Sequence, residues 1–389
     1  MPLNLERAQN KINELGLDAI LASSPENFFY ASDLYIPFID RFRGFLSGLG
    51  AFALIPREGD VIVSTTALDA DLAKLTSPIK DVRFTRTWAY FQRDGAHEID
   101  VYENPVESLT EIVKEKGLSK AKIGMEEKTL PIGDYRNITK SLPDVEFVDS
   151  SKTFLDIRAV KLQEEIDRIR KACEVSEKAF DAAFSICKEG TSEAEILGAF
   201  QQKVLDELGY IPKGIHHQNF TIGKHSATVR RGEPLDLKLK KGDIMRFDGG
   251  AIYKGYRCDF ARTHVLGKAE DKVKKVYNAL VSAELNIIDM IKPGVKFSDL
   301  FKMGLKTVQE AGYPEFERKH FGHGLGLITE EEPLISPYND TLVEENMVLC
   351  VEVPYYWTGV GGFNAEDVVR VHSDGVEILT PNLSKELEM

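Results

Sequence analysis

A single histidine lies between two glycines in the second half of the chain, and a cluster of acids follows it. His323 stands in the stretch FGHGLGL, and the next polar stretch contains Glu330, Glu331 and Glu332. The flanking glycines have no Cβ, so the backbone can pass close to a metal cluster at this point. An imidazole combined with carboxylates suits Mn, Co, Zn or Fe(II) better than Ca. These residue types predict that His323 is a metal ligand.

Four further acids occur as two matching pairs. Asp248 and Glu352 each stand six residues after a turn residue, and each is followed by a glycine-containing turn and a second acid, Asp259 or Glu366. Asp248 and Glu352 lie within apolar stretches, where a buried carboxylate is costly unless a cation compensates it. If the two pairs are related by a pseudo-twofold axis, all four carboxylates can converge on one point, where the imidazole of His323 completes the set. The spacing therefore predicts a metal centre.

The elements around these acids repeat as well. Residues 184–210 and 288–313 each run from a helix through a Lys-x-Gly turn into a second helix and end at Gly-Tyr. Each helix pair precedes the strands that carry one acid pair. An internal duplication of this kind predicts one domain built from two similar halves.

The first part of the chain has a different pattern, in which apolar runs alternate with helical periodicity. The runs predict a helix at 4–16 and strands at 17–23, 50–65 (a hairpin), 121–127 and 145–149. A long amphipathic helix is expected from about residue 162. We therefore expect an α/β domain at 1–155 and a second domain at 156–389.

Net charge, apolar runs and cysteine spacing exclude several classes of protein. The chain has 389 residues and a formal net charge of -13, which argues against nucleic-acid binding because that needs clustered Lys and Arg. There is no apolar run near the length of a membrane span and no leading signal, so a cytoplasmic location is expected. Four scattered cysteines without CxxC spacing are expected to be buried free thiols.

The motifs resemble those of the pita-bread metallopeptidases, the family of methionine aminopeptidase, aminopeptidase P and prolidase, with creatinase as a relative. The similar stretches are FDGGAIYKGYRCDFART, GHGLGL with its following EEP, VEVP and NAEDVV. The resemblance implies an α+β pita-bread domain holding two divalent ions. By resemblance, Asp259 and Glu366 bridge the ions, Asp248 chelates one, and His323 and Glu352 hold the other.

The N-terminal part is similar to the creatinase and prolidase type of N-terminal domain, in NFFYASDLYIPF and RTWAYFQRD among other stretches. Methionine aminopeptidases lack such a domain, which makes them the weakest match. Creatinase does not keep the metal ligands, so a metal-free mechanism is not expected here. Dimeric relatives of this type imply a homodimer.

Two histidines that contact substrate in the family's peptidases are replaced in this chain. The position seven residues after His323 is Glu330, and an ungapped count places the other at Arg231; an insertion in that loop would shift the second position. One interpretation is a peptidase in which His225 or His320 takes over the lost role. The other is a hydrolase of a non-peptide C–N bond, with Glu330 and Arg231 binding substrate.

The resemblance also implies the chemistry. The ions would activate a water molecule and polarise the scissile carbonyl, Glu352 would act as general acid and base, and His323 would serve the catalytic centre as a ligand. The leading prediction is an Xaa-Pro dipeptidase or aminopeptidase P acting on small peptides. The alternatives are a hydrolase of other small amides, as creatinase and ectoine hydrolase are, and a non-catalytic binding protein that kept the fold.

Overall fold

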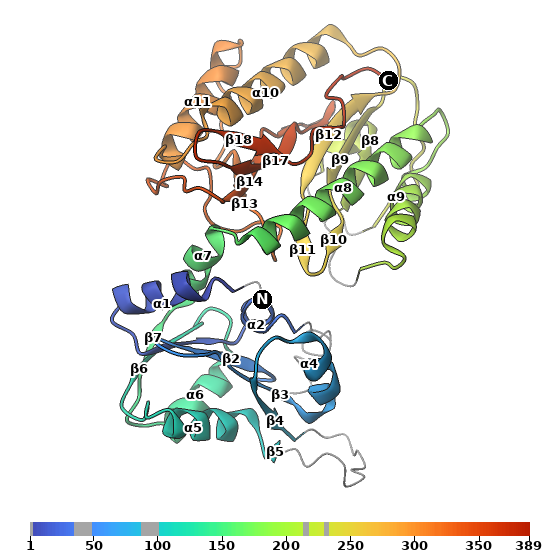
Figure 1. Cartoon of the computed structure of the whole chain (residues 1–389). Coiled ribbons are helices and arrows are strands. Elements are labelled where there is room, and N and C mark those ends of the chain that lie inside the picture. Colours follow the sequence, from blue (N-terminus) through green and yellow to red (C-terminus); the bar gives the residue numbers. More distant parts are fainter. Residues whose placement is uncertain (1–2, 35–48, 87–100, 213–217, 229–232) are drawn as a thin grey trace. The chain divides into compact units, whose positions relative to one another are not determined.

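The structure is a computed structural model that describes residues 3–34, 49–86, 101–212, 218–228 and 233–389 (Figure 1). The chain divides into two compact units, Met1–Arg158 and Ala159–Met389. Each unit has its own sheet, and each sheet has its own apolar core.

The first unit is built on a mixed sheet with the strand order β5-β4-β3-β2-β1-β6-β7. Its strands are β1 (Ala19–Ala22), β2 (Phe52–Pro56), β3 (Ile62–Thr66), β4 (Asp81–Thr85), β5 (Val101–Tyr102), β6 (Lys122–Met125) and β7 (Glu146–Asp149). Its helices are α1 (Leu5–Glu14), α2 (Pro25–Ser32), the short η1 (Ala67–Asp69), α4 (Ala70–Thr76), α5 (Pro105–Glu115), α6 (Ile132–Ser141) and α7 (Ser151–Ala159). Strand β1 is antiparallel to β2 and parallel to β6. The expected α/β class is confirmed for this part of the chain.

Several elements of this unit were predicted from sequence. The expected hairpin is the antiparallel pair β2 and β3. Helix α1 begins at Asn4, whose side chain accepts a hydrogen bond from the Arg7 amide, and Gly16 follows its end with φ +63°. A side-chain N-cap and a left-handed glycine are the usual helix boundaries. Strand β4 was not predicted, because the charged residues Asp81 and Arg83 interrupt its apolar pattern. In the structure these two residues form an ion pair with each other.

The second unit contains two helix pairs and a second large sheet. The helices are α8 (Gln163–Ser185), α9 (Glu193–Leu208), the short η2 (Gly223–Ala227), α10 (Asp271–Met290) and α11 (Phe297–Glu310). The strands of the main sheet are β8 (Gln218–Ile222), β9 (Ile244–Gly249), β12 (Phe260–Val265), β13 (Gly322–Gly324), β14 (Val348–Glu352), β17 (Glu366–Val371) and β18 (Val376–Ile378). Two small ribbons complete it: β10 (Ile252–Tyr253) with β11 (Tyr256–Arg257), and β15 (Tyr355–Trp357) with β16 (Gly361–Phe363).

The strand order of the main sheet reveals the internal duplication. The order is β13-β14-β17-β12-β9-β8, with β18 paired to β17. The helix pair α8 and α9 precedes β9 and β12, and the pair α10 and α11 precedes β14 and β17. Matching strands therefore occupy mirrored places in the sheet, with β12 and β17 adjacent at its centre. This arrangement confirms the predicted pseudo-twofold repeat of an α+β domain.

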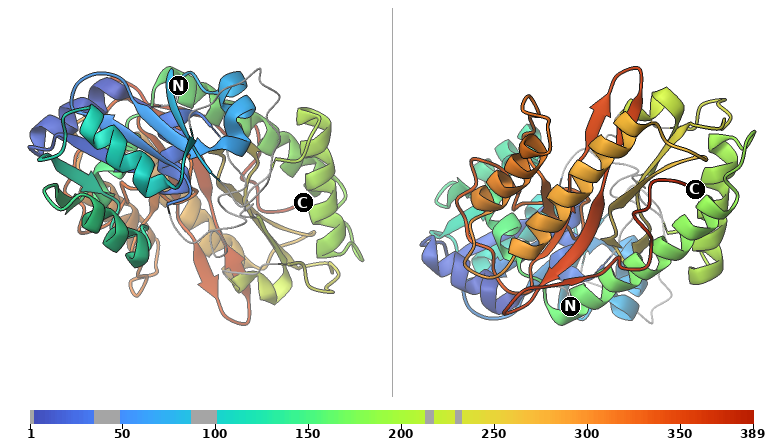
Figure 2. Two further views of the ribbon diagram at one scale, coloured as in Figure 1. Left: turned by 90° about the horizontal axis from the view of Figure 1, so that it is seen from below. Right: turned by 90° about the horizontal axis from the view of Figure 1, so that it is seen from above.

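The helices cover one face of this sheet. His264 of β12 packs edge-on against Phe184 of α8, with ring centroids 4.5 Å apart. On the same face, Asp367 of β17 shares the ammonium group of Lys385 with Glu284 of α10. Figure 2 shows the two helix pairs, green and orange, running beside the strands. Because side chains alternate along a strand, the neighbouring residues of β12 and β17 point to the opposite face.

The long helices of this unit are amphipathic. Helices α8 and α10 bury apolar residues along one side and expose charged residues along the other. Within the described ranges, no helix combines the length and the apolar character that crossing a bilayer would need.

The buried His264 makes a measurable prediction about acid stability. Burial lowers its pKa to about 4, and its Nδ1 atom lies 2.6 Å from the Glu386 carbonyl oxygen. The unfolded chain takes up this proton near pH 6.5, so the folded state loses stability as the pH falls from about 6.5 towards 4. By pH 5 the loss is about 2 kcal/mol at 1.36 kcal/mol per pKa unit. We expect His264→Gln to flatten this part of the pH profile in denaturant unfolding, and His225→Gln, an exposed histidine, is the matched control.

Candidate metal centre

The register of the second sheet directs all the predicted ligands to one face. Glu352 lies directly opposite Glu366, and Glu366 lies opposite Ala261, which in turn pairs with Asp248. Paired residues on neighbouring strands point to the same face. Asp259 precedes Ala261 by two residues and shares that face. The four acids of the two halves therefore converge on the side of the sheet away from the helices.

His323 reaches the same face from β13 because its neighbours are glycines. It pairs with Cys350, which lies two residues before Glu352 on β14. A Cβ on Gly322 would lie 2.0 Å from the Cys350 carbonyl oxygen, and one on Gly324 would lie 2.6 Å from the Glu332 carbonyl oxygen. Gly322 also has φ +134°. Both glycines are thus required for close contact between main-chain segments.

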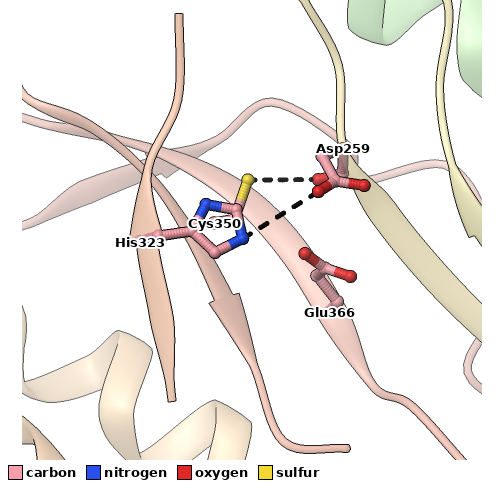
Figure 3. Close-up of side chains that lie close together, drawn as sticks. All are labelled: Asp259, His323, Cys350 and Glu366. Carbon is pink, nitrogen blue, oxygen red and sulfur yellow. Dashed lines mark hydrogen bonds and ion pairs between the residues drawn. The ribbon is translucent and has the colours of Figure 1, made fainter. Parts of the chain in front are cut away.

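Four side chains form the tightest group on this face. Ligand atoms of Asp259, His323, Cys350 and Glu366 all lie within 4.8 Å of one another, and all four residues are buried (Figure 3). The His323 Nε2 atom is 3.9 Å from Asp259 Oδ2. Its Nδ1 atom is 3.1 Å from the Gly324 carbonyl oxygen. That contact orients the ring so that Nε2 faces the cluster, the usual way in which a ligand histidine is held.

The electrostatics of the group call for a cation. Burial, and then the charges of Asp248 and Glu352, raise the pKa of Asp259 well above its usual range. Burial and the charge of Asp259 do the same to the pKa of Glu366. The Asp259 Oδ1 atom is buried without a hydrogen-bond partner among the described residues. Buried carboxylates that repel each other and leave an oxygen unpaired fit a divalent metal ion.

Asp248 and Glu352 flank this group. Asp248 accepts a hydrogen bond of 2.6 Å from the Arg246 guanidinium, which is completely buried on β9. Glu352 Oε1 lies 3.4 Å from His320 Nδ1. The Asn364 amide donates to Glu366 at 3.1 Å and reaches Glu352 at 3.5 Å. The face therefore contains the five predicted ligand positions, with an arginine at one end and a histidine at the other.

The predicted substrate residues have different settings. His320 is half-buried beside Glu352, and burial lowers its pKa in spite of that carboxylate. Glu330 is exposed, yet its charge contributes to the raised pKa of Asp259. His225 is exposed on η2. Arg231 lies outside the described residues. Of these four positions, His320 has the most direct contact with a predicted ligand.

The segment that carries Glu330 is held by its buried neighbour. Glu331 accepts a hydrogen bond from the Ile328 amide at 2.9 Å, and its main chain pairs with Gly324 in both directions. Lys161 Nζ lies 4.0 Å from its carboxylate. The Arg257 side chain donates to the Leu327 carbonyl oxygen at 2.9 Å. These contacts fix the turn after His323, so Glu331 is structural while Glu330 faces outward.

Sequence reasoning overlooked Cys350, which was expected to be an inert buried thiol. It is buried and free, as expected, but its sulfur lies among the ligand atoms. The signal was present in its spacing, since a residue two positions before a strand ligand points to the same face. A thiolate favours Zn and other softer ions over Mn.

A substitution at Cys350 tests this contribution. We expect Cys350→Ser to weaken binding of Zn²⁺ and Cd²⁺ on the order of 10-fold while changing Mn²⁺ affinity little, because a hydroxyl is a poor ligand for soft ions. Competitive metal titration measures the affinity for Zn²⁺ or Cd²⁺ relative to that for Mn²⁺ in each variant. Cys187→Ser, outside the cluster, is the matched control. Equal effects on Mn²⁺ and Zn²⁺ would show that the thiol does not ligate.

Comparison with known proteins agrees with this architecture. Residues 167–373 match the model of metallopeptidase family M24, and residues 4–160 match the creatinase/prolidase N-terminal domain. An uncharacterized peptidase of Staphylococcus aureus (strain USA300) is 31% identical over 263 residues, which cover 67% of this chain and 73% of the relative.

Two solved structures extend the likeness over nearly the whole chain. The dipeptidase from Pyrococcus horikoshii OT3 has a TM-score of 0.82 at 26% identity and covers 99% of each chain. The prolidase from Pyrococcus furiosus has a TM-score of 0.78 at 25% identity, covering 97% of this chain and 100% of its own.

Proposed function

Because this chain belongs to metallopeptidase family M24, we propose that it is a metal-dependent dipeptidase that cleaves small Xaa-Pro peptides. The observation that carries the proposal is the convergence of acids from both halves of the sheet, with His323, on one buried cluster. The structural likeness to a dipeptidase and a prolidase supports the choice of a dipeptide substrate.

We assign the metal-ligating roles to the residues on this face. The residues that would hold metal are Asp248, Asp259, His323, Glu352 and Glu366. Asp259, His323 and Glu366 belong to the tight group, and Asp248 and Glu352 flank it. Bound divalent ions would lower the pKa of a water molecule and polarise the scissile carbonyl. Asp259 lies directly before β12 and Glu366 begins β17, and these two strands are adjacent at the centre of the sheet, which supports the place of both acids at the middle of the site.

Glu352 and His320 are the proposed proton-transfer pair. Glu352 lies at the edge of the cluster and is close to His320 Nδ1. A carboxylate in this position can accept a proton from the attacking water and pass it to the leaving nitrogen. His320 can hold that carboxylate in place or donate to the substrate, which is the role that the replaced family histidines leave open.

The first test is hydrolysis of an Xaa-Pro dipeptide panel by protein reconstituted with Mn, Co or Zn, with metal content measured alongside. Cleavage that depends on bound metal and prefers proline would support the proposal. Bound metal without cleavage of any peptide would exclude the dipeptidase assignment, and a chain that binds no metal would exclude the metal centre as well.

Substitution of His320 examines its assigned role. We expect His320→Gln to lower kcat/KM for the best dipeptide on the order of 100-fold, since it removes one positioned proton donor or acceptor. Metal content should stay at the wild-type value. His225→Gln, an exposed histidine, is the control. If the His225 variant loses activity and the His320 variant does not, the assignments are reversed.

One observation favours a second candidate, a hydrolase of non-peptide C–N bonds. The position after the His323 turn that the family's peptidases fill with a histidine is the exposed carboxylate Glu330. An acid there would attract a cationic substrate such as an amidine or a guanidinium compound. A panel of such compounds, run beside the dipeptides, separates the two candidates.

Three further parts of the proposal come from the sequence. We propose Mn, Co, Zn or Fe(II) as the working ion, a homodimer as the assembly and the cytoplasm as the location. Activity with each metal, light scattering of the purified chain and cell fractionation test them in turn.

A further inference from the structure

The completely buried arginine beside the metal ligands has no role in the proposed reaction. Arg246 lies on β9 two residues before Asp248 and points to the same face. Its Nη1 atom donates to Asp248 Oδ2 at 2.6 Å. We propose that Arg246 occupies the position of one of the two cations, so that the chain binds one divalent ion tightly and a second only by displacing this guanidinium.

The contacts of Arg246 hold it in that place. Its Nε atom donates to the Ser226 carbonyl oxygen at 3.1 Å, and Nη2 donates to the Thr228 carbonyl oxygen at 3.1 Å. The Tyr356 ring lies 5.3 Å from the guanidinium carbon, within the range of a cation–π contact. The side chain has no exposed surface through which to withdraw into water. Its charge is therefore a permanent part of the site.

This arrangement obstructs a second ion in two ways. One oxygen of Asp248 is already committed to a charged hydrogen bond, so it cannot take part freely in chelation. An ion at Asp248 would also lie close to a buried positive charge. Displacing the guanidinium breaks a buried ion pair, so we expect binding of the second ion to be weakened by roughly 100-fold or more.

Comparison of the two repeated halves shows that they contribute different side chains to the site. Asp248 and Glu352 are matching acids of the two halves, and the residues two positions before them are Arg246 and Cys350. One half thus directs a potential ligand at the centre, and the other half directs a cation at it. The tight ligand group contains Asp259, His323, Cys350 and Glu366 and leaves Asp248 out. The two ends of the centre are chemically different.

The experiment counts ions and does not need a substrate. The full chain is stripped with a chelator, titrated with Mn²⁺ or Co²⁺ by calorimetry and analysed for metal after desalting. We expect about one retained ion per wild-type chain, with a second binding event weaker by roughly 100-fold. Arg246→Met should retain two ions, and Arg246→Lys, which keeps the charge, should retain one.

A second variant decides the matter even if Arg246→Met fails to fold. Asp248→Asn keeps the size of the side chain, and we expect it to retain the same single ion as the wild type. Loss of an ion in Asp248→Asn, or two tightly held ions in the wild type, would overturn the proposal. The inference rests on the proposed metal centre but not on the peptide substrate. If the chain binds two ions tightly and cleaves dipeptides, only the role of Arg246 is overturned. If it binds a single ion and cleaves no dipeptide, only the proposed substrate is overturned.

Discussion

The variant Asp259→Asn is expected to lose its bound metal and to lose activity by about 1000-fold or more, because catalysis depends on the ion's charge. Asp259 lies at the middle of the cluster, close to His323 Nε2, and the Asp259 Oδ1 atom has no hydrogen-bond partner among the described residues. The amide keeps the size of the side chain but removes the negative charge that attracts the ion. Elemental analysis and dipeptide hydrolysis on the same preparation measure both effects.

Although Asp259→Asn is expected to lose metal and activity, it should not lose stability in the metal-free state. Burial and neighbouring acids raise the pKa of Asp259, so folding without metal favours the protonated acid. The metal-free wild type therefore loses stability as the pH rises above the ordinary carboxyl pKa of about 3.9, until it passes the raised value in the folded state. An asparagine avoids this repulsion.

Melting curves of the wild type and Asp259→Asn at neutral pH, each with and without metal, reveal these two effects. We expect the metal-free Asp259→Asn chain to melt at or above the temperature of the metal-free wild type, and added metal to raise the melting temperature of the wild type only. Asp289→Asn, an exposed acid on α10, is the control. An Asp259→Asn protein that keeps its metal would remove Asp259 from the centre.

The features of the centre that were predictable from sequence are those with a local chemical signature. His323 between glycines signals a tight backbone passage, and the structure shows two carbonyl oxygens where the Cβ atoms would lie. The acid pairs were recognisable because the two halves repeat the same spacing around Asp248 and Glu352. Repeated spacing carries information about a shared sheet face, since the side-chain period of a strand is two residues.

The features that escaped prediction depend on strand register and on packing. Arg246 and Cys350 lie inside apolar strands, where a cation and a thiol give no sign of which face they occupy until the neighbouring strands are placed. The hydrogen-bond partner of Arg246 on η2 is Ser226, and that of Cys350 is the carbonyl oxygen of Asp259, just before β12; both partners are distant in sequence. Packing also explains why β4 was not predicted. Its charged residues Asp81 and Arg83 form an ion pair with each other on the strand, which the sequence pattern does not reveal.

Arg246 and Cys350 also show how the metal binding of this site can differ without a change in the metal ligands themselves. Both act on the centre without changing any of the five predicted ligands, so a comparison of ligand residues alone would not detect them. In this chain, the residues two positions before Asp248 and Glu352, which are Arg246 and Cys350, are therefore the ones that we expect to set the metal content.

The variant Glu352→Gln should separate metal binding from catalysis. Glutamine keeps an oxygen that can face the ion but cannot accept a proton at neutral pH, so the ion is expected to stay while kcat falls by about 100-fold to 10,000-fold. Glu352 is suited to the proton-transfer role because its carboxylate lies at the edge of the cluster, with His320 Nδ1 3.4 Å from one oxygen and Asn364 near the other.

Three variants make the test of Glu352 decisive. Metal content and KM should match the wild type in Glu352→Gln, whereas Glu352→Ala, which removes the ligand oxygen as well, should also lose metal affinity. Glu345→Gln, an exposed residue of the turn before β14, should behave as the wild type. Full turnover by Glu352→Gln would assign the proton transfer to another group, and His320 is then the nearest candidate, because its ring is the titratable group beside this carboxylate.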